Sequence, residues 1–146
     1  MTESAPPPPT LFDRAVAATI VLAAVAIVVP LALVDADPRG HGTHEALGMD
    51  PCDWADELGR PCPTCGVTTA ATHLVHLRPL TAMWTQPFGA LLAAGGLWLA
   101  AVAAWSLVRN QPFLARIALW PYGTILVGYV ALLFAAWAWT DWRWER

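Results

Sequence analysis

Cys62 and Cys65 are the residues of this chain whose type and spacing are best suited to chemistry. They are separated by Pro63 and Thr64 and followed at once by Gly66, after which apolar residues recur with helical spacing. The start of a helix leaves N–H groups unpaired and carries a partial positive charge, and both favour a thiolate over a thiol. The sequence therefore predicts a dithiol at a helix start, with Cys62 at the N-cap and more reactive than Cys65 inside the first turn.

Cys52 is the third cysteine, and three thiols cannot all pair within one chain. The residues around it, Asp-Pro-Cys-Asp-Trp, are typical of a turn that leads into a short helix. Such a turn would bring Cys52 within chain reach of Cys62. We therefore expect a Cys62–Cys65 bridge in an oxidising compartment, or a bridge in which Cys52 replaces one of the two.

The histidines that follow the cysteine pair match zinc ligands only in their spacing. His73 and His76 follow Cys65 in a segment predicted to be a continuous helix. At about 1.5 Å per residue, His73 would lie about 12 Å along the axis from Cys65, whereas Zn–N bonds are about 2 Å long. These histidines therefore cannot share a metal ion with the pair. A zinc site is still an alternative, formed by Cys52, Cys62 and Cys65 together with His41, His44 or a carboxylate; no other cofactor is implied.

A short amphipathic helix is predicted to begin at Val67. At about 100° per residue, one arc contains only apolar side chains and the other only threonines and histidines. The apolar arc comprises Val67, Ala70, Ala71, Leu74, Val75 and Leu77, and the polar arc comprises Thr68, Thr69, Thr72, His73 and His76. At a length of about 16 Å this helix covers half a bilayer core, so we expect an interfacial or re-entrant helix with a solvated polar face.

The composition is that of a membrane protein. Of 146 residues, 57% are hydrophobic and only 13% are charged, and the mean hydropathy is +0.48, which is far from a soluble domain. Uncharged runs at residues 15–34, 88–108 and 117–140 are each long enough to cross a hydrocarbon core of about 30 Å. The predicted fold is an all-α integral membrane protein with three transmembrane helices and one short amphipathic helix.

The remaining segments connect these spans into a single membrane domain, residues 15–146. Residues 1–14 carry four consecutive prolines and predict a disordered tail. Residues 35–87 contain the cysteine loop and the amphipathic helix. The arginine bias of short loops favours a cytoplasmic N-terminus and a cytoplasmic link at residues 109–116, with the cysteine loop and the C-terminus outside.

The cysteine run also carries a resemblance. Cys62-Pro63-x-Cys65-Gly66-x-Thr68, a short helix and the step Gln86-Pro87 together resemble a bacterial membrane-protein domain family of unknown function that is marked by Cys-Pro-x-Cys-Gly-x-Thr. The likeness extends to Leu92. Thr69 and Gln86 stand where that family favours arginine and asparagine. The resemblance implies a multi-pass membrane protein and points to the cysteines, but it implies no activity.

Several function classes can be weighed against these features. The predicted spans contain no Asp, Glu, Lys, Arg or His, which disfavours a transporter acting alone. The net charge of −3 is too small and scattered for a nucleic-acid partner. The sequence favours a non-enzymatic module of the cell membrane, surrounded by lipid, whose small-residue helix at residues 88–108 binds another membrane protein. Thiol–disulfide exchange by the cysteine pair ranks second and metal binding third, so whether the protein is an enzyme stays open.

Overall fold

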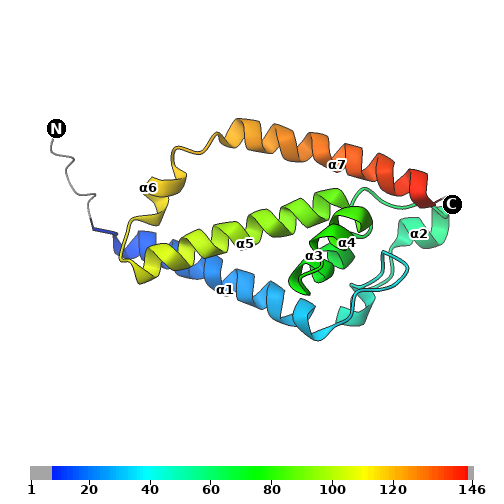
Figure 1. The fold of residues 1–146 in the computed structure, drawn as a ribbon, viewed down its shortest axis with the longest axis horizontal. Helices are drawn as coiled ribbons and strands as arrows, with labels where there is room; N and C mark the ends of the chain where they lie inside the picture. The colour runs from blue at the N-terminus through cyan, green and yellow to red at the C-terminus, as the bar shows by residue number, and fades with distance from the viewer. Residues whose placement is uncertain (1–7, 145–146) are drawn as a thin grey trace. The chain divides into compact units, whose positions relative to one another are not determined.

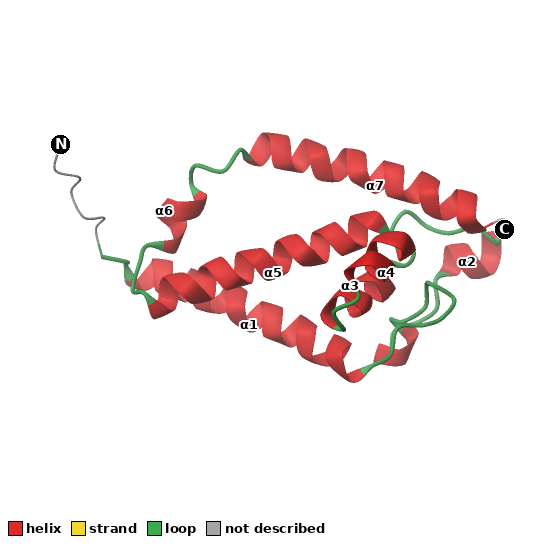
Figure 2. Cartoon of the chain, in the orientation of Figure 1, coloured by secondary structure: helices red, strands yellow, loops and turns green. Residues whose placement is uncertain are grey.

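The fold is helical throughout the part of the chain that the structure, a computed structural model, describes. That part is residues 8–144, and it contains no β-strand (Figure 2). Residues 1–7, the first half of the predicted proline-rich tail, lie outside it. Residues 11–14, which were assigned to the tail, are helical instead. The tail prediction is wrong there because Leu11–Arg14 contains no proline or glycine, whereas the prolines that disfavour a helix lie before Thr10.

Three helices are long and apolar enough to cross a membrane, which confirms the predicted fold class. They are α1 (Leu11–Leu33), α5 (Pro87–Val108) and α7 (Tyr122–Trp144) (Figure 1). The third span begins five residues later than predicted, directly after Pro121, because a proline has no N–H to donate and disfavours the continuation of a helix through it. The residues before it form a separate short helix, α6 (Phe113–Ile117).

The observed ends of the long helices include charged residues that the predicted spans excluded. Asp13 and Arg14 lie in the first turn of α1, and Asp141 and Arg143 lie in the last turns of α7. The central parts of the helices are uncharged, as expected. At helix ends such groups find water or polar partners, as Asp13 does with backbone N–H groups of α6 and Asp141 does with Arg60, whereas at membrane depth they would be costly.

Short helices lie between the first two spans. They are η1 (Glu45–Leu47), α2 (Asp53–Leu58), α3 (Val67–Val75) and α4 (Pro79–Thr85). The predicted amphipathic helix is α3, and α3 packs beside α4 (Figure 1).

No separate helix was predicted for the segment after α3. Pro79 opens α4 there, because proline has the φ of a first helical turn and needs no hydrogen-bond donor at that position. Pro87 opens α5 in the same way.

The chain divides into two compact units. Met1–Ile27 and Gly95–Pro121 make one, and Val28–Ala94 and Tyr122–Arg146 make the other. The first unit is built around Ala17 of α1, Ala103 of α5 and Phe113 of α6, all almost completely buried. Small residues on the two long helices allow the backbones to approach closely and leave room for the one large ring.

Asp13 fixes α6 within this first unit. Its carboxylate accepts the N–H groups of Phe113 at 2.9 Å and Leu114 at 2.8 Å, and its own N–H is bonded to Thr10 Oγ1. The side chain is buried, with 5% of its residue surface exposed. It therefore satisfies the free N–H groups at the start of α6, and its charge favours that helix end.

The second unit contains the cysteines. Ala70 of α3, Ala82 of α4 and Ala90 of α5 form its buried apolar contact. Gly89 of α5 lies so close to α3 that a Cβ atom would stand 2.7 Å from the Cα atom of Val67. The start of α5 therefore packs directly on the backbone at the start of α3.

We expect Asp13→Ala to lower the free energy of unfolding by about 2–4 kcal/mol, because two N–H groups would lose a charged acceptor while buried. Arg14→Ala, at an exposed neighbouring position, is the matched control and should change stability by less than about 0.5 kcal/mol. Thermal unfolding of the full chain in detergent micelles measures both. Equal effects of the two substitutions would show that the Asp13 cap does not stabilise the fold.

Two glycines of α5 provide a second matched pair. Gly96 has no atom near a built Cβ, so Gly96→Ala should raise stability by about 0.5–1 kcal/mol through helix propensity. Gly89→Ala should instead cost about 1–3 kcal/mol, because the neighbour that must move is backbone. Thermal midpoints of the two variants give the comparison. A stabilised Gly89→Ala would contradict the close contact between α5 and α3.

Candidate functional site

The cysteine pair occupies a turn that precedes α3. The N–H of Cys65 donates to the carbonyl of Cys62 at 3.0 Å, and the N–H of Val67 donates to the carbonyl of Thr64 at 3.1 Å. Gly66 then adopts a left-handed φ of 86° and is the N-cap of the helix. The prediction that Cys62 is the N-cap is therefore wrong: two linked turns and a left-handed residue separate it from α3. Only glycine adopts that conformation without strain.

The two thiols differ in burial and in acidity. Cys62 is half-buried and Cys65 is buried, with 6% of its surface exposed. Burial tends to raise the pKa of Cys62, but hydrogen bonds from the hydroxyl and N–H of Thr64 and from the Cys52 thiol bring that pKa below its usual range. Burial, and then the nearby Cys62 and Cys52, raise the pKa of Cys65 to about 12.

Cys62 is thus the thiol that more readily becomes a thiolate. This is the order that the sequence predicted, but the cause is hydrogen bonding by Thr64 and Cys52, and not a helix N-cap. The greater reactivity of Cys62 itself stays a prediction.

Cys52 comes close to the pair from the N-cap of α2, as expected from its turn. All three cysteines are free. Residues 8–144 contain no group of three or more His, Cys, Asp or Glu side chains arranged to hold a metal ion. His41 instead packs on the ring of Trp144, at a centroid distance of 4.4 Å, and His44 precedes η1 as its N-cap. The geometry therefore brings the thiols together without these histidines.

The threonines of α3 are not on a solvated face. Thr69 is 1% exposed and Thr72 is fully buried, whereas Leu77 of the predicted apolar arc is 88% exposed. Thr69 Oγ1 and Thr43 Oγ1 are hydrogen-bonded at 2.9 Å, and Thr72 donates to the carbonyl of Thr68. The interpretation of a wet polar face is wrong for Thr69 and Thr72, which are buried. Thr43 belongs to the loop at residues 35–48, here called the covering loop, and it supplies the polar partner of Thr69.

The two histidines of that face lie at an intermediate depth. The Nε2 atom of His76 is 3.2 Å from the carbonyl oxygen of Leu31 at the end of α1. Burial, and then the charge of Arg78, lower the pKa of His73, so its imidazole is held neutral at pH 7. Neither residue takes part in the thiol cluster.

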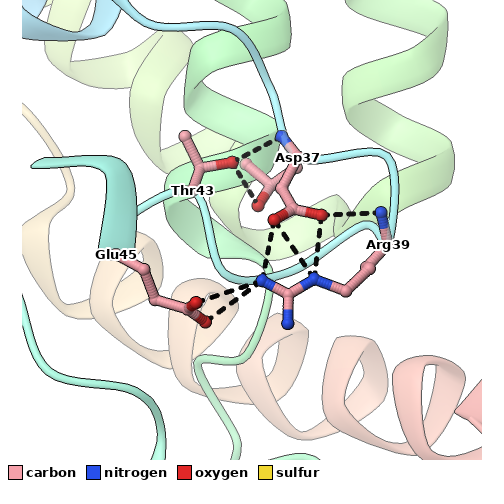
Figure 3. Close-up of polar contacts among 5 residues, drawn as sticks. Asp37, Arg39, Thr43 and Glu45 are labelled. Atoms are coloured by element: carbon pink, nitrogen blue, oxygen red, sulfur yellow. Dashed lines mark hydrogen bonds and ion pairs between the residues drawn. The ribbon is translucent and has the colours of Figure 1, made fainter.

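An ion-pair network gives the covering loop its shape. Thr43 Oγ1 accepts the N–H of Asp37, while Arg39 pairs with the carboxylates of Asp37 at 2.8 Å and Glu45 at 3.1 Å (Figure 3). Hydrogen bonding by Arg39 lowers the pKa of Asp37 despite some burial. The hydrogen bond between Thr69 and Thr43 thus connects α3 to the covering loop. Within that loop, Arg39 pairs with both carboxylates.

Gly66 and Gln86 fit the turn against its surroundings. A Cβ atom on Gly66 would stand 2.8 Å from the carbonyl oxygen of Gly40 and 3.5 Å from Gln86 Cβ. Gln86 is fully buried and accepts the N–H of Gly89, and its Nε2 atom has no partner among the described residues. In the sequence, Gln86 was noted only through the resemblance. A single amide between α4 and Pro87 is part of no periodic pattern that would indicate its burial.

The turn is approached from α7 as well. The indole N–H groups of Trp137 and Trp144 donate to the carbonyls of Pro61 and Gly59, each at 2.9 Å, and Arg60 pairs with Asp141 at 2.6 Å. A groove of about 400 Å³ runs beside this contact, lined by Trp54, Leu58, Arg60, Pro61, Trp137, Ala138 and Asp141.

The cysteine turn lies in a segment that is similar to a known protein family. Residues 55–100 match the model of a family described as protein of unknown function, DUF2752. The match runs from α2 into α5 and includes Cys62 and Cys65, whereas Cys52, the covering loop and α7 lie outside it. No curated protein and no solved structure matches the chain. The similarity and the three long apolar helices fit a membrane protein of unknown activity.

We expect Thr64→Val to slow the alkylation of Cys62 by iodoacetamide at pH 7. Removing the hydroxyl removes a hydrogen bond that lowers the thiol pKa, so the thiolate fraction at pH 7 should fall about three- to tenfold. Rates measured by mass spectrometry between pH 6 and about pH 10 separate this effect from access, because they should converge above the pKa of both proteins.

Thr68→Val, at a threonine of α3 outside the turn, is the control and should leave the pH profile unchanged. A rate ratio for Thr64→Val that is constant with pH would contradict the assigned role of the Thr64 hydroxyl.

Proposed function

We propose that this chain is a membrane-embedded dithiol protein, in which Cys62 and Cys65 exchange a disulfide with a protein partner at the membrane surface. The observation that carries the proposal is a single hydrogen-bonded turn with a cysteine at each end. Cys62, at its start, is half-exposed, and Cys65, at its end, is buried. A hydrogen-bonded turn of this type holds its end residues within about 7 Å, which is compatible with the Cα separation of about 4.4–6.8 Å in a disulfide.

The chemistry assigns a different role to each cysteine. The Cys62 thiolate attacks the partner's disulfide, forms a mixed disulfide and releases one partner thiolate. The Cys65 thiol then loses its proton to water and attacks Cys62, which releases the second partner thiolate. The partner gains two electrons and the pair is left as a Cys62–Cys65 disulfide; the reverse sequence oxidises a partner dithiol. A low pKa at Cys62 favours the first step.

The proposal includes a position in the cell. We place the protein in the cell membrane as a multi-pass protein, with the cysteine turn on the outer side. Short loops with arginine favour that orientation, and thiol exchange is most useful where disulfides persist. The helix at residues 88–108 is proposed to contact another membrane protein, although Ala90 is already used against Ala70 and Ala82 within the chain.

A non-enzymatic role has its own supporting observation. Gly66 lies against Gly40, Thr69 bonds to Thr43, and Gly89 lies against Val67. The segment that carries the cysteines is therefore also a site of close packing. Steric fit is enough to explain some of its residue types, the glycines above all. In this second candidate the cysteines would serve as a structural bridge in a membrane assembly module.

Trapping of mixed disulfides distinguishes the two functions. With Cys52→Ser/Cys65→Ser, neither neighbouring thiol can resolve a mixed disulfide on Cys62, so reductant-sensitive adducts should accumulate on non-reducing gels of intact cells. Cys52→Ser/Cys62→Ser should yield at least about tenfold less adduct, because Cys65 is buried and weakly acidic.

Cys52→Ser alone is the control and should show no accumulation, since Cys65 remains to resolve the adduct. Equal adducts from the two double variants would exclude the proposed roles. No adduct in either, together with a lower thermal midpoint in both, would support the structural bridge instead.

A further inference from the structure

A second, smaller cavity of the cysteine-bearing unit is not explained by thiol chemistry. It has a volume of about 170 Å³ and is lined by Arg39, Gly40, His41, Thr85, Thr140, Arg143 and Trp144. A cavity of this size has room for several water molecules or for one small group such as a phosphate.

Arg143 is the residue that makes this cavity unusual. Its guanidinium stacks over the rings of Trp84 at 5.1 Å and Trp139 at 5.9 Å and donates to the carbonyl of Trp84. Within residues 8–144 it has no carboxylate partner. Two indole faces and one backbone oxygen orient the guanidinium but do not neutralise it, so a positive charge with further N–H donors is held at the cavity.

The other polar residues that line the cavity can also donate hydrogen bonds. Arg39 and His41 add a second guanidinium and an imidazole, and Thr85 and Thr140 add hydroxyl groups. Among residues 8–144, no carboxylate lines the cavity: Asp37 and Glu45 pair with Arg39 but are not lining residues. Arg39 is already paired with these two carboxylates, so the guanidinium of Arg143 is the group of the lining that can pair with an added anion.

We propose that this cavity binds a phosphate group, with Arg143 as the principal ligand. The phosphate can come from a lipid headgroup or from free phosphate in solution. Trp139, Trp142 and Trp144 at the end of α7 are typical of the level at which headgroups lie, and arginine is the residue that matches phosphate geometry with paired N–H donors. This site goes beyond the dithiol proposal and does not depend on it.

The test uses the purified full chain in two arms. In nanodiscs of phosphatidylcholine alone, inorganic phosphate is titrated calorimetrically. In detergent micelles, retention of phosphatidylglycerol is measured by native mass spectrometry. We expect binding in at least one arm, weakened at least about tenfold by Arg143→Gln. Arg109→Gln is the matched control, because Arg109 also stacks on an indole, that of Trp105 at 4.7 Å, but lies outside the cavity.

The two arms identify the source of the phosphate. Calorimetric binding of inorganic phosphate indicates a free anion as ligand, and lipid retention without it indicates a headgroup. Absence of binding in both arms would overturn the proposal, and so would equal losses in Arg143→Gln and Arg109→Gln.

A second variant covers the case in which Arg143→Gln does not fold. Thr140→Glu places a carboxylate in the lining, where it can pair with Arg143 and repel phosphate, so binding should be lost. Thr81→Glu, on an exposed position of α4 outside the cavity, should bind as the wild type does. Unchanged binding by Thr140→Glu would contradict the site.

Discussion

The contact between the cysteine turn and its neighbours depends on two missing side chains. Gly66 faces the carbonyl of Gly40, and Gly89 faces the backbone of Val67, each at a distance that leaves no room for a Cβ atom. Because interiors are close-packed, these contacts fix the start of α3 relative to both the covering loop and the start of α5. Cys65, next to Gly66 in the chain, and Thr69, bonded to Thr43, are buried beside the same contacts.

The covering loop supplies a hydrogen-bond partner for the buried polar face of α3. Thr43 satisfies Thr69, which allows a polar face to be buried without the cost of an unpaired hydroxyl. Burial in turn keeps the Cys65 thiol protonated, while the turn leaves Cys62 half-exposed beside the hydroxyl of Thr64. The two thiols therefore differ in pKa because Cys65 is buried and Cys62 accepts hydrogen bonds, and not because they differ in residue type.

Sequence reasoning located the spans and the cysteine pair because both are signalled by neighbouring residues. Uncharged runs are visible along the chain, and so is a Cys-x-x-Cys spacing. It placed the helix start at Cys62, since a proline after the cysteine suits a first turn, whereas the left-handed Gly66 is the real N-cap. It also assigned Thr69 and Thr72 to solvent, because helical periodicity separates polar from apolar faces but does not reveal a partner 26 residues away in a loop.

The central claim is that Cys62 and Cys65 act as one two-electron pair, and a redox titration in native membranes tests it most directly. Membranes would be equilibrated with glutathione buffers of increasing oxidised fraction, alkylated, and mapped by mass spectrometry. The account predicts that a Cys62–Cys65 disulfide forms at a single midpoint while Cys52 stays open to alkylation throughout. Similar alkylation of all three thiols at every ratio, with no disulfide formed, would contradict it.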